Sequence, residues 1–117
     1  MWDNSSGVRV YLCVGSTDMR KQINGLSIQV EQTMELDPFS GSMFVFCNRR
    51  RTIVKALYWD RNGFCLWQKR LERDRFRWPE TAGEVMAISP WQLRWLLDGL
   101  EVFQGHAHRQ LQYSSVT

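Results

Sequence analysis

The chain has 117 residues, of which 44% are hydrophobic and 23% are charged, and its net charge is +3 at pH 7. This length predicts one domain with a packed core, and the composition excludes a largely disordered protein. No stretch resembles a signal peptide or approaches the roughly 18 apolar residues of a membrane span, so we expect a cytoplasmic protein with no membrane partner.

The first third of the chain predicts a strand followed by a helix. Residues 8–14 are β-branched and apolar, as is typical of a strand. Thr17 or Asp18 can cap a helix that runs to about Met34, because apolar residues then recur every three or four positions.

The middle of the chain predicts an antiparallel meander. Residues 43–47, 52–59 and 64–70 alternate or are continuously apolar, and short polar turns separate them. Residues 73–78 continue the alternation and predict a further strand. We expect these strands to pair in sequence order.

The turn after residue 59 sets the expected register. If Asn62-Gly63 forms a two-residue turn, Lys55 lies opposite Arg70. Two facing cations lower stability unless an anion or an acid lies between them. A longer loop would shift the pairing by one residue.

The last third predicts a short strand at residues 85–88 and a second helix. Ser89-Pro90 is a typical helix start, because proline is favoured at the first helical position. We place the domain at residues 1–105 and a polar tail without periodicity at 106–117.

The three cysteines and two histidines argue against a cofactor. Cys13, Cys47 and Cys65 are odd in number and widely spaced, which favours free thiols in a reducing compartment. No cysteine pair has metal-ligand spacing, and His106 and His108 lie in the tail. We expect neither a metal nor another cofactor.

Positive charge is concentrated in the middle of the chain. Residues 49–77 hold ten Lys or Arg and three acids, a net charge of +7, whereas the remaining residues have a net charge of −4. A local positive field attracts anionic partners, and guanidinium groups fit phosphate oxygens. The predicted DNA-binding residues are Arg49, Arg50, Arg51, Lys55, Lys69, Arg70, Arg73, Arg75 and Arg77.

Two other interpretations of these charges stay open. Arginines at 73, 75 and 77 alternate with Phe76 and Trp78, so the rings are expected in the core and the guanidiniums on the other side. Those guanidiniums are either available to phosphates, or merely solvated, or paired with acids such as Glu72 and Glu101. The Arg49–Arg51 tip can equally serve solubility.

The sequence contains no convergent catalytic set. Asp18, Asp37 and Asp60 occupy positions typical of caps and turns. No serine has the context of a nucleophile elbow, and no glycine-rich phosphate loop is present. We therefore expect a protein that is not an enzyme.

Four ordered blocks resemble a known family: TDMRKQINGL (17–26), DPFSGSMFVFCNRRR (37–51), VKALYWDRNGFCLWQKRLERDRFRWP (54–79) and ISPWQLRWLLDGLEV (88–102). They closely resemble the small TnpB accessory protein of bacterial insertion sequences of the sixty-six type. This TnpB is the product of the second open reading frame and is not the RNA-guided nuclease that shares the name. The resemblance covers roughly residues 8–103.

The resemblance implies a role in DNA transposition beside a separate, larger transposase that carries out the chemistry. It supplies no catalytic set. The chain departs from the family pattern at Asp74, where glycine is usual, and at Gln68, where an aromatic residue is common. Positions that match the family blocks include Asp18, Arg20, Trp59, Asp60 and Gly63.

Together these patterns predict an α+β domain with a four- or five-stranded, mostly antiparallel sheet, one helix after the first strand and a second helix near the C-terminus. We expect a non-catalytic accessory protein for transposition that binds DNA, with the transposase as an implied partner. The alternative is a module that bridges the transposase to other element-encoded proteins through Trp91, Arg94 and Trp95, because Trp and Arg are enriched in interface hot spots. Burial of both rings against the sheet would weaken this alternative.

Overall fold

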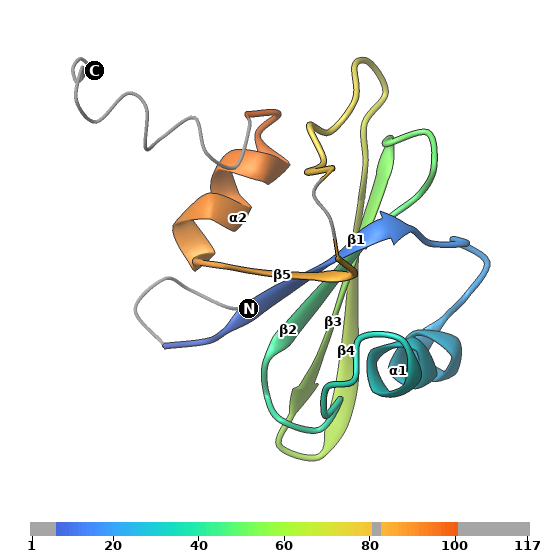
Figure 1. Cartoon of the computed structure of the whole chain (residues 1–117), viewed down its shortest axis with the longest axis vertical. Helices are drawn as coiled ribbons and strands as arrows, with labels where there is room; N and C mark the ends of the chain where they lie inside the picture. The colour runs from blue at the N-terminus through green and yellow to red at the C-terminus, as the bar shows by residue number, and fades with distance from the viewer. Residues whose placement is uncertain (1–6, 81–82, 101–117) are drawn as a thin grey trace.

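The fold is built on one five-stranded sheet, shown in Figure 1. The computed structural model describes residues 7–80 and 83–100. In chain order the elements are β1 (Val10–Ser16), α1 (Ile23–Gln32), β2 (Met43–Cys47), β3 (Ile53–Asp60), β4 (Gly63–Arg70), β5 (Val85–Ile88) and α2 (Pro90–Leu97). The predicted α+β class is confirmed, with both helices at their expected places in the chain.

The strands lie in the order β4-β3-β2-β1-β5. The predicted meander of β2, β3 and β4 is antiparallel, as is the pair of β1 and β5. Only β1 and β2 are parallel among the described strands. Parallel strands need a long crossover connection, and the segment containing α1 supplies it.

Both faces of the sheet are covered, because the strands carry apolar side chains on both sides. On one face, α1 packs Leu26 against Phe44 and its neighbours. On the other face, α2 and the segment after β4 pack Leu96 and Trp78 against Met43 and its neighbours. Figure 1 shows the two helices on opposite sides of the sheet, and we call these sides the α1 face and the α2 face.

Helix α1 begins at Ile23, so the predicted start at Thr17 or Asp18 was wrong. The Asp18 carboxylate accepts a hydrogen bond from the Arg20 N–H (2.9 Å) and closes a turn instead. Lys55 Nζ donates to the carbonyls of Met19 and Lys21, both at 2.9 Å. These local and long-range bonds hold residues 17–22 as a loop.

The register of β3 and β4 also differs from the prediction. Asp60 pairs with Gly63, so the turn residues are Arg61 and Asn62, and Lys55 lies opposite Gln68 rather than Arg70. The observed register places Leu57 opposite Leu66 and Trp59 opposite Phe64. Burial of apolar cross-strand pairs on the α1 face thus outweighed the turn preference of Asn62-Gly63.

Residues 73–78 form no strand, although their predicted alternation is correct. Phe76 is 2% exposed and Trp78 is 6% exposed, and both lie in the α2-face core as predicted. The Trp78 Nε1–H donates to the Cys13 carbonyl at 3.1 Å. Asp74 has a φ of +66°, in the left-handed region, which interrupts the extended backbone that a strand requires.

The start of α2 follows the prediction. Ser89 Oγ accepts from the Gln92 N–H, and Gln92 Oε1 accepts from the Ser89 N–H, which together form a capping box. Pro90 stands at the first helical position. The predicted β5 before it is confirmed as Val85–Ile88.

Two predictions concern residues outside those described. The tail at 106–117, with its two histidines, and the domain boundary at residue 105 both lie there. Within the described ranges, neither helix has the length and apolar character needed to cross a membrane.

Candidate nucleic-acid interface

Two basic segments that are separate in the sequence lie side by side. The first is the β2–β3 tip, where Asn48 Oδ1 accepts from the N–H groups of Thr52 and Ile53, both at 2.9 Å. The second is segment 71–78, whose Leu71 N–H donates to the Thr52 carbonyl at 2.8 Å. In Figure 1 the green tip and the yellow segment are neighbours at the top of the view.

A second backbone bond fixes this arrangement. The Phe76 N–H donates to the Arg51 carbonyl at 2.7 Å, and the Arg51 guanidinium lies 6.0 Å from the centre of the Trp78 ring. Arg51 is half-buried and has a φ of +61°. Arg51 therefore connects the tip to segment 71–78 through both its carbonyl and its side chain.

Five exposed arginines lie on the tip and on segment 71–78. We call them the basic surface: Arg49, Arg50, Arg73, Arg75 and Arg77. No hydrogen bond or ion pair joins their side chains to another residue within 7–80 or 83–100. Pairing with Glu72 is therefore absent, and Glu101 lies outside the described residues. Neighbouring positive charges repel one another, and an anion placed between them would relieve that repulsion.

An open groove runs beside segment 71–78. It has a volume of about 820 Å³ and lies between that segment and the end of α2. Its lining includes the charged side chains of Lys69, Arg73, Asp74, Arg75, Arg77 and Asp98. Cations outnumber acids in this lining, so the groove extends the positive field of the basic surface.

Two predicted DNA-binding residues at the end of β4 already have partners. Lys69 Nζ donates to the Leu97 carbonyl at 2.9 Å and satisfies the C-terminal end of α2. Arg70 forms an ion pair with Glu72 at 3.1 Å, in which both side chains are mostly exposed. An exposed pair of this kind contributes little to stability, so Arg70 remains available to a stronger partner.

Lys55 lies away from the basic surface, so the structure corrects its predicted role. Its side chain is only 3% exposed and points to the α1 face, where its ammonium group bonds to the carbonyls of Met19 and Lys21. Those two bonds hold the Lys55 charge inside the fold, away from any DNA. Sequence reasoning missed this role because the partners are distant in the chain.

The first family block lies next to the tip, which the sequence did not indicate. Asp18 and Arg20 form an ion pair at 2.6 Å, and hydrogen bonds from Arg20 lower the pKa of the Asp18 carboxyl to about 2. A depression of about 500 Å³ separates residues 16–19 from residues 48–50. The two segments meet because β1 and β2 are parallel, and parallel strands end at the same edge of a sheet.

The remaining family positions lie at the opposite end of the β3–β4 hairpin. Asp60 and Gly63 close its turn. The Trp59 ring packs against Phe39 and Phe64 with centroid distances of 5.1 and 5.0 Å, and Phe39 is 57% exposed. This ring cluster was not predicted, because Phe39 belongs to a distant loop.

The residues of the alternative interface lie on α2. Trp91 is 54% exposed, and the Arg94 guanidinium lies 5.8 Å from its ring centre. Trp95 is half-buried. The two rings are therefore not both buried against the sheet, and the alternative keeps its structural support.

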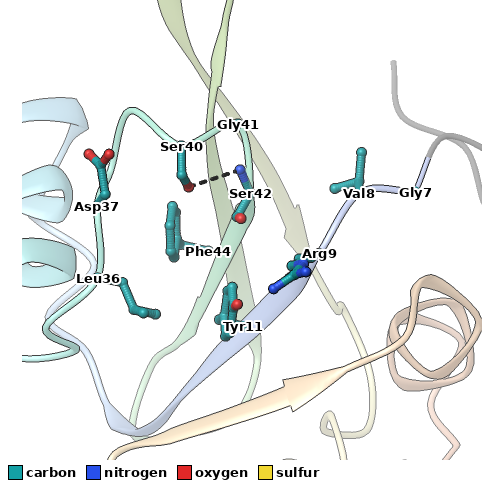
Figure 2. A pocket seen from close by; sticks show the side chains of 10 residues that line it. All are labelled: Gly7, Val8, Arg9, Tyr11, Leu36, Asp37, Ser40, Gly41, Ser42 and Phe44. Carbon is teal, nitrogen blue, oxygen red and sulfur yellow. Dashed lines mark hydrogen bonds between the residues drawn. The ribbon is translucent and has the colours of Figure 1, made fainter.

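A pocket near the start of β1 is a further candidate site (Figure 2). It has a volume of about 580 Å³, with Arg9 and Tyr11 on one side and the loop carrying Ser40 and Ser42 on the other. The Ser42 N–H donates to Ser40 Oγ at 3.2 Å. The Tyr11 ring stacks on the buried Phe44. Its mixed polar and aromatic lining points to no specific reaction.

The Cys47 thiol is not an activated nucleophile. Cys13, Cys47 and Cys65 are free, as predicted, and burial raises the pKa of the Cys47 thiol to about 11. A thiol with a raised pKa stays protonated near neutral pH and reacts slowly. Within residues 7–80 and 83–100, no three His, Cys, Asp or Glu side chains come together as metal ligands.

Comparison with known proteins places the chain in a family. Residues 8–107 match the family described as IS66 Orf2 like protein. The chain is 41% identical over 101 residues to the uncharacterized protein y4hO of Sinorhizobium fredii, covering 86% of this chain and 88% of that protein. It is 32% identical over 97 residues to the uncharacterized protein y4jC of the same organism, covering 83% of each. No solved structure matches. The chain therefore belongs to the IS66 Orf2-like family of insertion-sequence accessory proteins.

Proposed function

We propose that this protein is a non-catalytic accessory factor for transposition that binds DNA through the basic surface in the cytoplasm. One observation carries the proposal: the Phe76–Arg51 backbone bond brings two arginine segments together, and the side chains of all five arginines are free within the described ranges. The DNA phosphate backbone is the polyanion that such a surface fits.

The anchoring of the arginines supports phosphate contacts over base readout. Segment 71–78 is anchored by the buried Phe76 and Trp78, so its backbone is ordered before binding and only the exposed arginine side chains lose conformational entropy when they contact a phosphate. Neither helix presents an arginine row to solvent as a major-groove reader would, because the surface is made of a tip and an irregular segment. We expect affinity with modest sequence preference.

The test is fluorescence anisotropy with labelled element-end DNA and a scrambled duplex, at several salt concentrations. The expected result is binding whose log–log salt slope is about −0.9 for each phosphate neutralised. Changing Arg73, Arg75 and Arg77 together to Ala should reduce the magnitude of the slope by about 2 to 3 and weaken binding to both duplexes.

A matched control changes Arg9 and Arg61 to Ala. Both arginines are exposed, and neither belongs to the basic surface. We expect this double variant to bind DNA within about threefold of the wild type. An equal loss for each charge removed, in the control and in the triple change, would show that only total charge matters and would contradict a defined surface.

A second function is favoured by the exposure of Trp91 beside Arg94. In this alternative the protein bridges the transposase to other element-encoded proteins through α2. The measurement is biolayer interferometry with the purified transposase of the same element, comparing the wild type with Trp91→Ala. Transposase binding that is lost in Trp91→Ala, together with no DNA binding at low salt, would favour bridging over the DNA proposal.

A further inference from the structure

Strand β4 forms one edge of the sheet, and no strand covers its outer side within the described ranges. Its backbone pattern can be read from one bond: the Leu71 N–H donates to Thr52, in continuation of the β3–β4 register. Bonded pairs alternate along an antiparallel ladder, so odd-numbered β4 residues bond to β3. The even-numbered residues direct their N–H and C=O groups outward: Phe64, Leu66, Gln68 and Arg70.

Most of this edge lacks the devices that normally prevent pairing, since the charges of β4 are confined to its last two residues, Lys69 and Arg70. Natural edge strands are short or carry charges, prolines or bulges. The opposite edge strand, β5, has four residues, whereas β4 has eight. Residues 63–67 of β4, GFCLW, contain neither a charge nor a proline, and the β3–β4 register has no bulge.

An exposed aromatic cluster lies at the same edge. Phe64 of β4 packs against Trp59 and Phe39 with ring-centre distances of 5.0 and 5.2 Å. Phe39 remains 57% exposed. The edge therefore combines unpaired backbone groups with apolar surface, which are the two requirements for adding a strand.

We propose that two copies of this protein pair through β4, antiparallel about a two-fold axis at Trp67, to form one ten-stranded sheet. Centring the axis there pairs all four outward-facing residues with one another. Phe64 lies opposite Arg70 of the second copy, and Leu66 lies opposite its Gln68. Both α1 faces then lie on the same side of the joined sheet.

Side-chain chemistry favours a second copy as the occupant. Each Arg70 guanidinium comes to lie beside the Phe64 ring and the aromatic cluster of the other copy, where a cation is stabilised by the ring faces. Its partner in the single chain, Glu72, is an exposed residue that holds it weakly. The arrangement repeats twice across the axis, and it does not depend on DNA binding.

Sedimentation equilibrium tests the pairing at micromolar to submillimolar concentrations. The wild type should show a monomer–dimer equilibrium. Gln68→Pro removes an outward N–H without removing a bond to β3, and Arg70→Glu reverses the charge beside the rings. Each change occurs twice in the dimer, so each should weaken dimerisation roughly tenfold or more.

Arg9→Glu is the matched control for charge reversal, because Arg9 is exposed and precedes β1, three strands from β4. It should change dimerisation by less than about twofold. Thermal melting checks that each variant folds, and Arg70→Glu carries the test if Gln68→Pro does not. The proposal would be overturned if the wild type is monomeric. It would also be overturned if the Arg70→Glu variant dimerises as strongly as the wild type.

A cysteine variant tests the register directly. In the proposed dimer, position 69 lies opposite Cys65 of the second copy, in a pair whose Cα atoms are about 4.5 Å apart. Lys69→Cys should therefore give a disulfide-linked dimer on mild oxidation with diamide. Positions 65 and 69 of one strand are about 13 Å apart, too far for a bond within the chain.

Gln68→Cys is the control for random collision, because its side chain points to the α1 face and lies opposite Leu66. It should cross-link at least tenfold more slowly than Lys69→Cys. Equal rates for the two variants would overturn the register about Trp67.

Discussion

Two irregular segments flank the Arg49–Arg51 tip, and they are held in opposite ways. Loop 17–22 is held by a charge, because the buried Lys55 ammonium bonds to two of its carbonyls. Segment 71–78 is held by apolar side chains, because Phe76 and Trp78 lie in the α2-face core. The first arrangement buries the Lys55 cation, whereas the second leaves the cations of Arg73, Arg75 and Arg77 exposed.

The comparison shows that a basic residue becomes available to a partner only when something else anchors its segment. Lys55 and Arg73 look equivalent in a list of positive charges. Lys55 faces a loop whose carbonyls need hydrogen-bond donors. Arg73 lies in a segment that is held to the fold by burial of the Phe76 and Trp78 rings, so its own charge is not needed for anchoring. Position in the packing, rather than residue type, separates the two roles.

The largest expected effect comes from removing an apolar anchor. Trp78→Ala deletes a buried ring and its bond to the Cys13 carbonyl, so the free energy of unfolding should fall by about 3–5 kcal/mol. Urea denaturation measures the change. Trp91→Ala, at an exposed ring, is the control and should cost less than about 1 kcal/mol. Similar losses for both would contradict the anchoring role of Trp78.

Removing the charged anchor should have a smaller effect. Lys55→Met retains most of the side-chain volume but loses two bonds from a charged donor, so we expect a loss of about 2 kcal/mol in urea denaturation. Because Lys55 lies away from the basic surface, the salt slope of DNA binding should not change. A slope reduced by about 1 would mean that Lys55 contacts a phosphate after all.

The backbone of segment 71–78 offers a third test. Asp74 has a φ of +66°, a conformation that glycine adopts without strain. Asp74→Gly and Asp74→Ala remove the same charge, but the glycine variant should be more stable by about 1 kcal/mol. Equal stability in urea would show that the left-handed conformation is not retained. Both variants should bind DNA more tightly, since an acid leaves the groove.

The smallest effect should be a pH dependence near loop 17–22. Arg20 lowers the pKa of the Asp18 carboxyl from 3.8 to about 2. A depressed pKa in the folded state stabilises the fold above pH 4, and this contribution is lost as the pH falls through 2. Melting temperatures of the wild type and Asp18→Asn should therefore differ slightly at pH 5 and converge near pH 2. A constant difference would assign the effect to something other than this carboxyl.

Local patterns in the sequence were sufficient for most of the elements. Strand β2 was predicted with its observed ends, and Ser89-Pro90 marked the start of α2, because caps and apolar runs act over a few residues. The exposed arginines and the buried rings of segment 71–78 followed from alternation alone. These features depend on neighbours in the chain.

The features that could not be predicted depend on distant partners. The loop before α1 is held in part by Lys55, which belongs to a distant strand. The β3–β4 register is decided by apolar pairs such as Leu57 with Leu66, against the local signal of Asn62-Gly63. The tip and segment 71–78 are adjacent because the Phe76 N–H donates a hydrogen bond to the Arg51 carbonyl. No short window of sequence contains both members of these pairs.

The place of β1 in the sheet has a consequence for the order of folding. Val10 pairs with Met43 on one side and with Ile88 on the other, so β1, from the start of the described chain, connects the meander to β5 near its end. The meander has short loops and can form early, whereas closing the large loop between β1 and β5 is slow. Hydrogen exchange should therefore find β5 and α2 opening as a unit while the meander remains protected.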